Sequence, residues 1–543
     1  MSSVPRAERA HRPADSWTNA LRGRIERIVP EGQALPARQP AYVSSWIYVF
    51  GVLTLTALAV VVATGCVLAV GGSAWWHVSS LGHFVNSLHL WSVELFFGFM
   101  VIHLWGKFWM AAWRGNRVLT WVTGVVAFVA SIGTAFTGYL SQSNFDSQWI
   151  SGQAKDGLNA IGVGAWFNVL NPGQMLLWHV VLLPLAVGAI TLLHVVLVRR
   201  HGVVPPIDAM GAAGVAEAAP TDSSGQGANR GTRDQTPDAH WFATRPYDLV
   251  KEFVVALVVV LLLTVGLAVV FSSPDEPSVT LAGWAKAAPN DVVATATAEL
   301  AGTSTSATYG PPYNTAAEGQ KVLGVPLQKW GGVRLPVDSA ALVLGPLTAA
   351  RTDPATTAAL STWRGAGAQQ QGAWATAYAD ALGKATDGNP AAVAKGDYGP
   401  VPVLAQSFLE VARSGGLEGQ LTSSGNFYGG DPTRAILLLT DGAYLEDTAR
   451  AQHLGGDQWG MMNETGNYPG QPWMWLYTFW YQVPPFSTSD NADAQVWALM
   501  MVLTLGLVFL PLIPGLRDIP RLVPVHRLIW RDYYLRHGRA KRQ

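Results

Sequence analysis

The sequence of 543 residues is short of cysteine and of charge. Its single cysteine, Cys66, excludes a disulfide framework, a cysteine-rich zinc site, a cysteine-ligated iron–sulfur cluster and the Cys-x-x-Cys-His attachment of a c-type haem. Charged residues make up 13% of the chain, about half the share of a soluble protein. The 36 basic residues balance the 36 acidic ones, which argues against nucleic-acid binding. With 49% hydrophobic residues, the chain is predicted to be a membrane protein.

Six stretches are long and apolar enough to cross a hydrocarbon core as helices, which takes about 20 residues. Four of them lie within about the first 200 residues, and the only His, Asp, Glu, Lys or Arg residues inside these four are four histidines and Glu94. The six stretches are 46–70, 84–105, 118–140, 174–198, 253–271 and 496–516. The sequence therefore predicts four neighbouring spans that form a bundle, and two further spans.

Lysine and arginine gather in four parts of the chain that a six-span topology places on one side of the membrane. They lie before the first span, between the second and third, after the fourth, and in the tail at 517–543. Loops rich in these residues stay in the cytoplasm. The sequence therefore predicts a multi-pass protein of the inner (plasma) membrane with both termini in the cytoplasm.

Two long connections separate the spans. The stretch 203–245 is rich in small and polar residues, as a flexible cytoplasmic linker is. The stretch 273–470 is long enough for a core of its own, so we expect a folded extracytoplasmic domain of mixed or uncertain class. The expected divisions are 1–43 (cytoplasmic segment), 44–202 (four-helix bundle), 203–245 (linker), 246–272 (fifth span), 273–470 (outer domain), 471–516 (a segment ending in the sixth span) and 517–543 (basic cytoplasmic tail).

Four histidines interrupt the second and fourth spans at matched spacing. His89 and His103 are 14 positions apart, and His179 and His194 are 15 apart. At about 100° and 1.5 Å per residue, either spacing returns the second histidine to nearly the same helix face, about 21 Å along. Because the two spans run in the same direction, His89 is expected level with His179. His103 is then level with His194, which predicts two bis-imidazole sites suited to haem iron.

Glycines of the first and third spans follow the same register. Gly51 and Gly65 are 14 positions apart, as are Gly124 and Gly138. Each expected histidine pair is then level with two glycines, which leave room for the edge of a flat macrocycle. Ordinary helix packing is the alternative for histidine or glycine alone. Eight residues in matched register favour an all-α membrane protein with a four-helix dihaem bundle, two further transmembrane helices and an inserted extracytoplasmic domain.

These residues resemble the cytochrome b family of quinol-oxidising bc1 and b6f complexes. The likeness is closest to the b6 type, in which the second histidine pair is also one residue wider, and it covers about residues 40–206. A weaker likeness to the family's C-terminal half continues around 245–270 and 472–516, which makes 273–470 an insertion. The matching motifs are Arg117-Val-Leu-Thr-Trp-Val-Thr-Gly124, Gly138-Tyr139 and His179…Leu-Pro…His194…Arg199.

The resemblance implies cofactors, substrate and partners. It implies two haem b groups, with His89 and His179 as iron ligands of the outer one and His103 and His194 of the inner one. It adds Arg117 and Arg199 to the cofactor-binding residues. It implies quinone and quinol as substrates, and a Rieske iron–sulfur protein and a c-type cytochrome or other redox subunit as partners, in a homodimer within membrane lipid.

The outer quinone site departs from the family pattern. Where the family has Pro-Glu-Trp-Tyr, this chain has Pro472-Trp473-Met474-Trp475. Glu94 is the only acidic residue within the first four spans; it is either a proton relay or a buried acid paired with a hydroxyl or backbone group. Trp473, Glu94 and Tyr139 are the candidate catalytic residues of this region.

Three functions remain open. The first is the quinol-reactive subunit of a cytochrome bc-like respiratory complex, similar to a quinol:cytochrome c reductase. The second is a linear dihaem conduit between a quinone pool and an extracytoplasmic redox partner, without quinol bifurcation. The third is a non-redox membrane scaffold for the outer domain.

Overall fold

The computed structural model describes residues 17–18, 21, 24, 38–160, 163, 167–207, 244–308, 338–350, 353–422, 430–489 and 491–540. Most of the expected N-terminal segment at 1–43 and most of the expected linker at 203–245 lie outside these residues. The described chain is almost entirely helical, which confirms the all-α prediction for the membrane part.

Five helices of the described residues are long and apolar enough to cross a membrane. Their outward faces are apolar, as lipid requires: Leu185 and Leu262 are each 69% exposed. The helices are α2 (Val49–Gly71), α4 (Ser80–Trp109), α5 (Val118–Leu140), the continuous helix of α7 (Pro172–Leu177), the π-helical turn η3 (Trp178–Leu182) and α8 (Leu183–His201), and α10 (Leu249–Phe271).

The helix expected at 496–516 is shorter than predicted. It is α23 (Ala492–Val508), 17 residues long, followed by the 3-10 turns η11 (Leu510–Leu512) and η12 (Leu516–Asp518). Pro511 and Pro514 lack the N–H groups that a continuing helix needs, so the predicted end at residue 516 is wrong. Helix α23 packs beside α5 and α6 (Phe145–Ala160).

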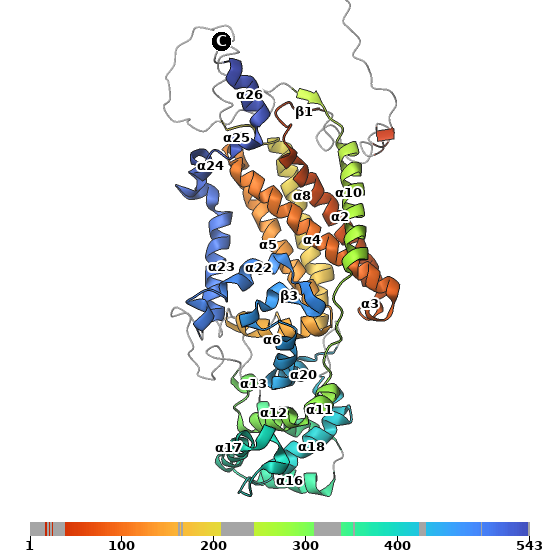
Figure 1. The fold of residues 1–543 in the computed structure, drawn as a ribbon, viewed down its shortest axis with the longest axis vertical. Helices are drawn as coiled ribbons and strands as arrows, with labels where there is room; N and C mark the ends of the chain where they lie inside the picture. The colour runs from red at the N-terminus through yellow and green to blue at the C-terminus, as the bar shows by residue number, and fades with distance from the viewer. Residues whose placement is uncertain are drawn as a thin grey trace, which may run out of the picture.

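The bundle is made of two helix pairs, α2 with α4 and α5 with α8, and α10 covers α2 and α4 (Figure 1). At one end, β1 (Arg38–Pro40) pairs antiparallel with β2 (Thr244–Pro246), with Gln39 opposite Arg245. The C-terminal helices α24 (Ile519–Leu522), α25 (His526–Ile529) and α26 (Arg531–Ala540) lie at the same end (Figure 1).

The region expected to be a domain of mixed or uncertain class is helical where it is described. Helix α18 is its centre and buries Leu404, Phe408 and Ala412 at helical spacing. Its helices lie at the end of the molecule opposite the C-terminus (Figure 1). They are α11 (Leu281–Ala287), α12 (Pro289–Ala301), α13 (Thr305–Thr308), α15 (Ser339–Ala349), α16 (Pro354–Gly365), α17 (Ala368–Lys384), α18 (Val401–Arg413), α19 (Gly416–Leu421), α20 (Thr433–Asp441) and α21 (Ala443–Ala451).

The helical region and the bundle share one hydrophobic core. Tyr139 at the end of α5 and Phe145 at the start of α6 belong to the same buried cluster as Trp284 of α11 and Leu438 of α20. Helix α6 lies across this end of the bundle (Figure 1). The short helix α3 (Trp75–Val78), the hairpin of β3 (Asn463–Glu464) and β4 (Tyr468–Pro469), and helix α22 (Pro472–Trp480) complete the junction.

Candidate functional site

Two of the four histidines face each other near the end of the bundle at which α5 is followed by α6. His89 lies on α4 and His179 on the π-helical turn, with their ring centroids 6.1 Å apart and their planes at 86°. Imidazole nitrogens bind transition metals at about 2 Å, so this separation leaves room for one metal ion between two rings on its opposite faces. The bundle thus holds a pair of imidazoles whose spacing would let both bind one metal ion.

Hydrogen bonds fix the tautomers of these rings. His179 Nδ1 lies 2.8 Å from the carbonyl oxygen of Thr134, which can only accept, so Nδ1 donates. His89 Nδ1 lies 3.0 Å from Thr64 Oγ1, whose own hydroxyl hydrogen is directed at the carbonyl of Val60, 2.8 Å away. Nδ1 of His89 is therefore also the donor. In both rings the hydrogen bond keeps the proton on Nδ1, so Nε2 keeps its lone pair for a metal. Hydrogen bonds to the other ring nitrogen orient metal-binding histidines in the same way.

The second pair lies nearer the other end of the bundle. His103 of α4 and His194 of α8 are close enough to interact electrostatically. His194 Nδ1 lies 3.1 Å from Thr123 Oγ1, and the Thr123 hydroxyl donates to the carbonyl of Leu119 at 2.9 Å. His103 Nδ1 is buried and has no hydrogen-bond partner among the described residues. The Nδ1 hydrogen bond of His194 is therefore built like that of His89.

Each of the four glycines lies directly against one histidine ring. A Cβ atom on Gly51 would lie 3.0 Å from His103 Cε1, one on Gly65 3.1 Å from His89 Cε1, and one on Gly124 3.0 Å from His194 Cε1. A Cβ on Gly138 would lie closer still to the ring of His179. These distances are shorter than nine in ten real Cβ contacts, so a side chain at any of the four glycines would crowd the ring that it faces, and the rings and glycines lie at two levels of the bundle.

The histidines occur as pairs rather than as larger clusters. Among the described residues, no group of three or more His, Cys, Asp or Glu side chains is arranged to hold a metal ion. Paired imidazoles suit a metal whose other ligands come from a macrocycle, whereas a zinc site takes three or four protein ligands. The residues present therefore fit haem better than a metal held by protein alone.

The two arginines expected near the cofactor have protein partners. Arg117 is buried, and its Nη2 donates to the carbonyl of His201 at 2.6 Å, which ties the start of α5 to the end of α8. Arg199 lies near Tyr247 and Glu252. Lys107 lies 5.1 Å above the ring of Tyr48, a cation–π contact one helical turn beyond His103.

Glu94, Tyr139 and Trp473 come together around an acid that the sequence motifs did not single out, Glu464 of β3. Tyr139 is hydrogen-bonded to Glu464, and Glu94 lies close enough to interact electrostatically. Trp473 stacks on Phe97 at 6.1 Å. The only available signal was that Glu464 is the one acid between residues 457 and 490.

A chain of hydrogen bonds connects this acid to the segment before α22. Trp473 Nε1 donates to Gln471 Oε1 at 3.2 Å, and Gln471 Nε2 donates to Glu464 Oε1 at 2.8 Å. Glu464 is only 2% exposed, and burial, together with the nearby Asp146, raises its pKa to about 8. Burial also raises the pKa of Asp146, against the effect of hydrogen bonds from Thr465. Near neutral pH, Glu464 is therefore a protonated acid at the edge of the bundle.

The fold and these levels define a helical membrane protein with two pairs of partly buried histidines at two levels of its bundle. Residues 94–277 match the family model described as "Cytochrome b(N-terminal)/b6/petB". Over these residues the chain belongs to the cytochrome b/b6 family, as the sequence motifs predict.

Three related proteins each match between 23% and 35% of this chain. Cytochrome b6 of Heliobacterium mobile is 27% identical over 190 residues, which are 31% of this chain and 89% of that protein. Cytochrome b6 of Heliobacterium modesticaldum is 27% identical over 214 residues, 35% of this chain and all of that protein. A cytochrome bc complex cytochrome b subunit of Chlorobaculum thiosulfatiphilum is 31% identical over 137 residues, and only 32% of its length is covered. A structure named "Hyperthermophilic respiratory Complex III" is 16% identical, with 73% of this chain and 96% of that chain covered, at a TM-score of 0.36.

Proposed function

We propose that the chain is a membrane b-type cytochrome that carries electrons across the membrane through two haem b groups, as the quinone-reactive subunit of a cytochrome bc-like respiratory complex. The observation that carries the proposal is the pairing of His89 with His179 at 6.1 Å, each with an Nδ1 hydrogen bond and a glycine against its ring. Bound haem supplies one-electron transfer. A c-type cytochrome or other redox subunit, a Rieske iron–sulfur protein and a second copy of the chain are the proposed partners.

In this function the residues of the chain bind the two haem groups and orient their ligands. His89 and His179 hold the outer haem, and His103 and His194 the inner one, about 21 Å apart along each helix. The threonine partners orient the rings by their Nδ1 hydrogen bonds. Arg199 and Lys107 contribute positive charge at the inner level, where reduced quinone carries negative charge or takes up protons.

The proposed topology has both termini in the cytoplasm and the helical region within 273–470 outside the plasma membrane. The basic tail lies at the end of the bundle opposite that region, which supports this orientation (Figure 1). We propose the divisions 44–202 for the dihaem bundle, 246–272 for the fifth span, and 471–516 for the outer-site segment with a short sixth membrane helix. The segments 1–43, 203–245 and 517–543 are proposed to be cytoplasmic.

The second candidate function is a linear conduit without quinol bifurcation. It is favoured by Trp473, which occupies the position of the family's motif glutamate and packs its ring on Phe97. In this function electrons pass through both haems in series, between the quinone pool and an extracytoplasmic partner. Both candidates share the two haem sites and differ in what happens at the outer quinone.

The first experiment measures haem b per chain in the purified complex. Wild-type protein is expected to bind two haems, His179→Ala to lose one, and the matched control His201→Ala, seven residues beyond His194, to keep both. A colourless wild-type protein contradicts the proposal and favours the scaffold. Reduction by quinol followed by a pulse of oxidant then separates the candidates: a transient extra reduction of haem b means bifurcation, and simple reoxidation means a linear conduit.

A further inference from the structure

Glu464 lies where three separate parts of the chain meet. Tyr139 reaches it from the end of α5, Gln471 from the segment before α22, and Asp146 from the start of α6. Asp146 is 1% exposed and accepts hydrogen bonds from the N–H and the hydroxyl of Thr465, the residue after Glu464. The hairpin that ends the outer helical region thus places one buried acid against another at the end of the bundle.

Further acids extend this pair in both directions. Toward the bundle, Glu464 interacts with Glu94, whose Oε1 is buried and has no hydrogen-bond partner among the described residues. Toward the surface, Asp146 interacts with Glu276, which is exposed. Four carboxyl groups therefore form a series that begins at Glu94 on the membrane helix α4 and ends at Glu276 in contact with solvent.

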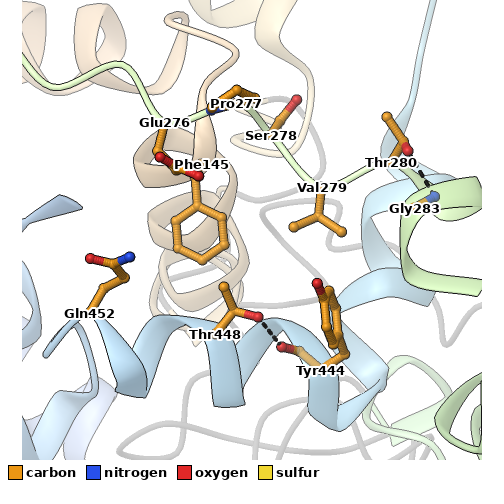
Figure 2. A pocket seen from close by; sticks show the side chains of 10 residues that line it. All are labelled: Phe145, Glu276, Pro277, Ser278, Val279, Thr280, Gly283, Tyr444, Thr448 and Gln452. Carbon is orange, nitrogen blue, oxygen red and sulfur yellow. Dashed lines mark hydrogen bonds between the residues drawn. The ribbon is translucent and has the colours of Figure 1, made fainter. Parts of the chain in front are cut away.

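The surface end opens into a pocket of about 290 Å³. Figure 2 shows Glu276 beside Phe145 at this pocket, with Tyr444 and Thr448 of α21 on the other side. The N–H of Phe145 donates to the carbonyl of Glu276 at 2.8 Å, which ties the start of α6, the helix of Asp146, to the segment that lines the pocket. Water in this pocket can take up protons from the buried acids.

We propose that Glu464 and Asp146 are the proton exit path of the outer quinone site, passing protons from Glu94 and Tyr139 to water at Glu276. The inference rests on the proposed function. A hydroquinone oxidised there becomes a quinone and releases two protons and two electrons. The electrons leave through the haems and the redox partner, and each proton moves from one oxygen to the next, directly or through water, with no further redox change.

This path supplies an acid that the motif lacks at position 473. Trp473 cannot take a proton, but its Nε1 donates to Gln471, which in turn donates to Glu464. The tryptophan therefore positions the acid instead of replacing it. A buried acid that is protonated near neutral pH can both receive and release a proton, as general acid–base groups do.

The first test is infrared spectroscopy of the purified full-length protein across a pH titration. Wild-type protein is expected to show a buried carboxylic acid that loses its proton near the pKa of about 8 given above for Glu464. Glu464→Gln is expected to remove this signal. The control Glu446→Gln, an exposed acid paired with Arg450, is expected to keep it. An unchanged signal in Glu464→Gln overturns the assignment.

The second test measures proton release with a pH-sensitive dye after quinol and oxidant are added. Glu464→Gln and Asp146→Asn are expected to slow release by about a hundredfold, with unchanged haem content, and Glu464→Asp to restore part of the rate. Release at the wild-type rate in Glu464→Gln overturns the path and leaves the haem assignment standing. Wild-type protein without haem overturns the proposed function and the path together.

Discussion

At the scale of single residues, the glycines differ in what lies opposite them. Gly138 of α5 lies against the ring of His179, whereas a Cβ on Gly133, five residues earlier on the same helix, would meet no side chain or other helix of the described residues within 4 Å. A helix glycine has no conformational need to be glycine when its φ is helical. The reason for Gly138 is therefore the histidine ring.

Alanine at position 138 is expected to displace that ring. Its Cβ would overlap Cε1 and Nδ1 of His179, so the ring must tilt and weaken its hydrogen bond to the Thr134 carbonyl. We expect Gly138→Ala to lose one of the two proposed haems, or to weaken its binding by about 10- to 100-fold, as changes around metal ligands do. Haem titration with absorbance measures this. Gly133→Ala is expected to bind both haems, and equal binding by the two variants would contradict the role of Gly138.

The histidines and glycines could be found from the sequence because their register is a property of single helices. Glu464 could not be found in this way, because its neighbour Thr465 meets Asp146 across 319 positions of the chain. No helical or strand period connects two residues so far apart. The acid becomes visible only when α6 and the hairpin are packed together.

At the scale of elements, the π-helical turn explains the unequal histidine spacings. His89 and His103 are 14 positions apart on the regular helix α4, while His179 lies within the turn η3, 15 positions before His194. A π turn holds one residue more than an α turn. Pro184 stabilises it, because its missing N–H cannot bond to the carbonyl of Val180. The π turn accommodates the extra residue, so the two histidines of each helix point to the same side of that helix despite the different spacings.

Deletion of Val181 tests this explanation. Removing one residue from the π turn is expected to leave a regular helix with a spacing of 14, so His179 still faces His89 and two haems per chain are retained. Deletion of Val93 from α4 is the matched control, since it turns His89 by about 100° away from its partner. We expect that deletion to lose one haem or both, as measured by haem content per purified chain. Equal loss in the two deletions would rule out the π turn as the cause.

At the scale of the whole molecule, the helices within 273–470 and the bundle are packed together through one buried core. His77 of α3 lies 2.7 Å from Asp275 Oδ1 through Nδ1 and 3.0 Å from the Gln142 carbonyl through Nε2, which joins the loops at the end of the bundle to the start of the outer region. The shared core around Trp284 and Phe145 adds to this. The sequence predicts a separate inserted domain, because residues 273–470 interrupt the succession of apolar spans. The contacts between this region and the bundle cannot be predicted from that interruption.

The buried acid at this junction makes the packing sensitive to pH. Glu464 has a pKa of about 8 in the folded protein against an ordinary value of 4.5. Between these values the folded state holds a proton that the unfolded state has released, so the free energy of unfolding falls as the pH rises, by up to about 1.4 kcal/mol per pH unit. Denaturant midpoints measured from about pH 5 to about pH 8 are expected to fall in wild-type protein and in Glu446→Gln. Glu464→Gln cannot release a proton, so its midpoint is expected to change less over this range, and a slope as steep as wild type would show that the loss of stability arises elsewhere.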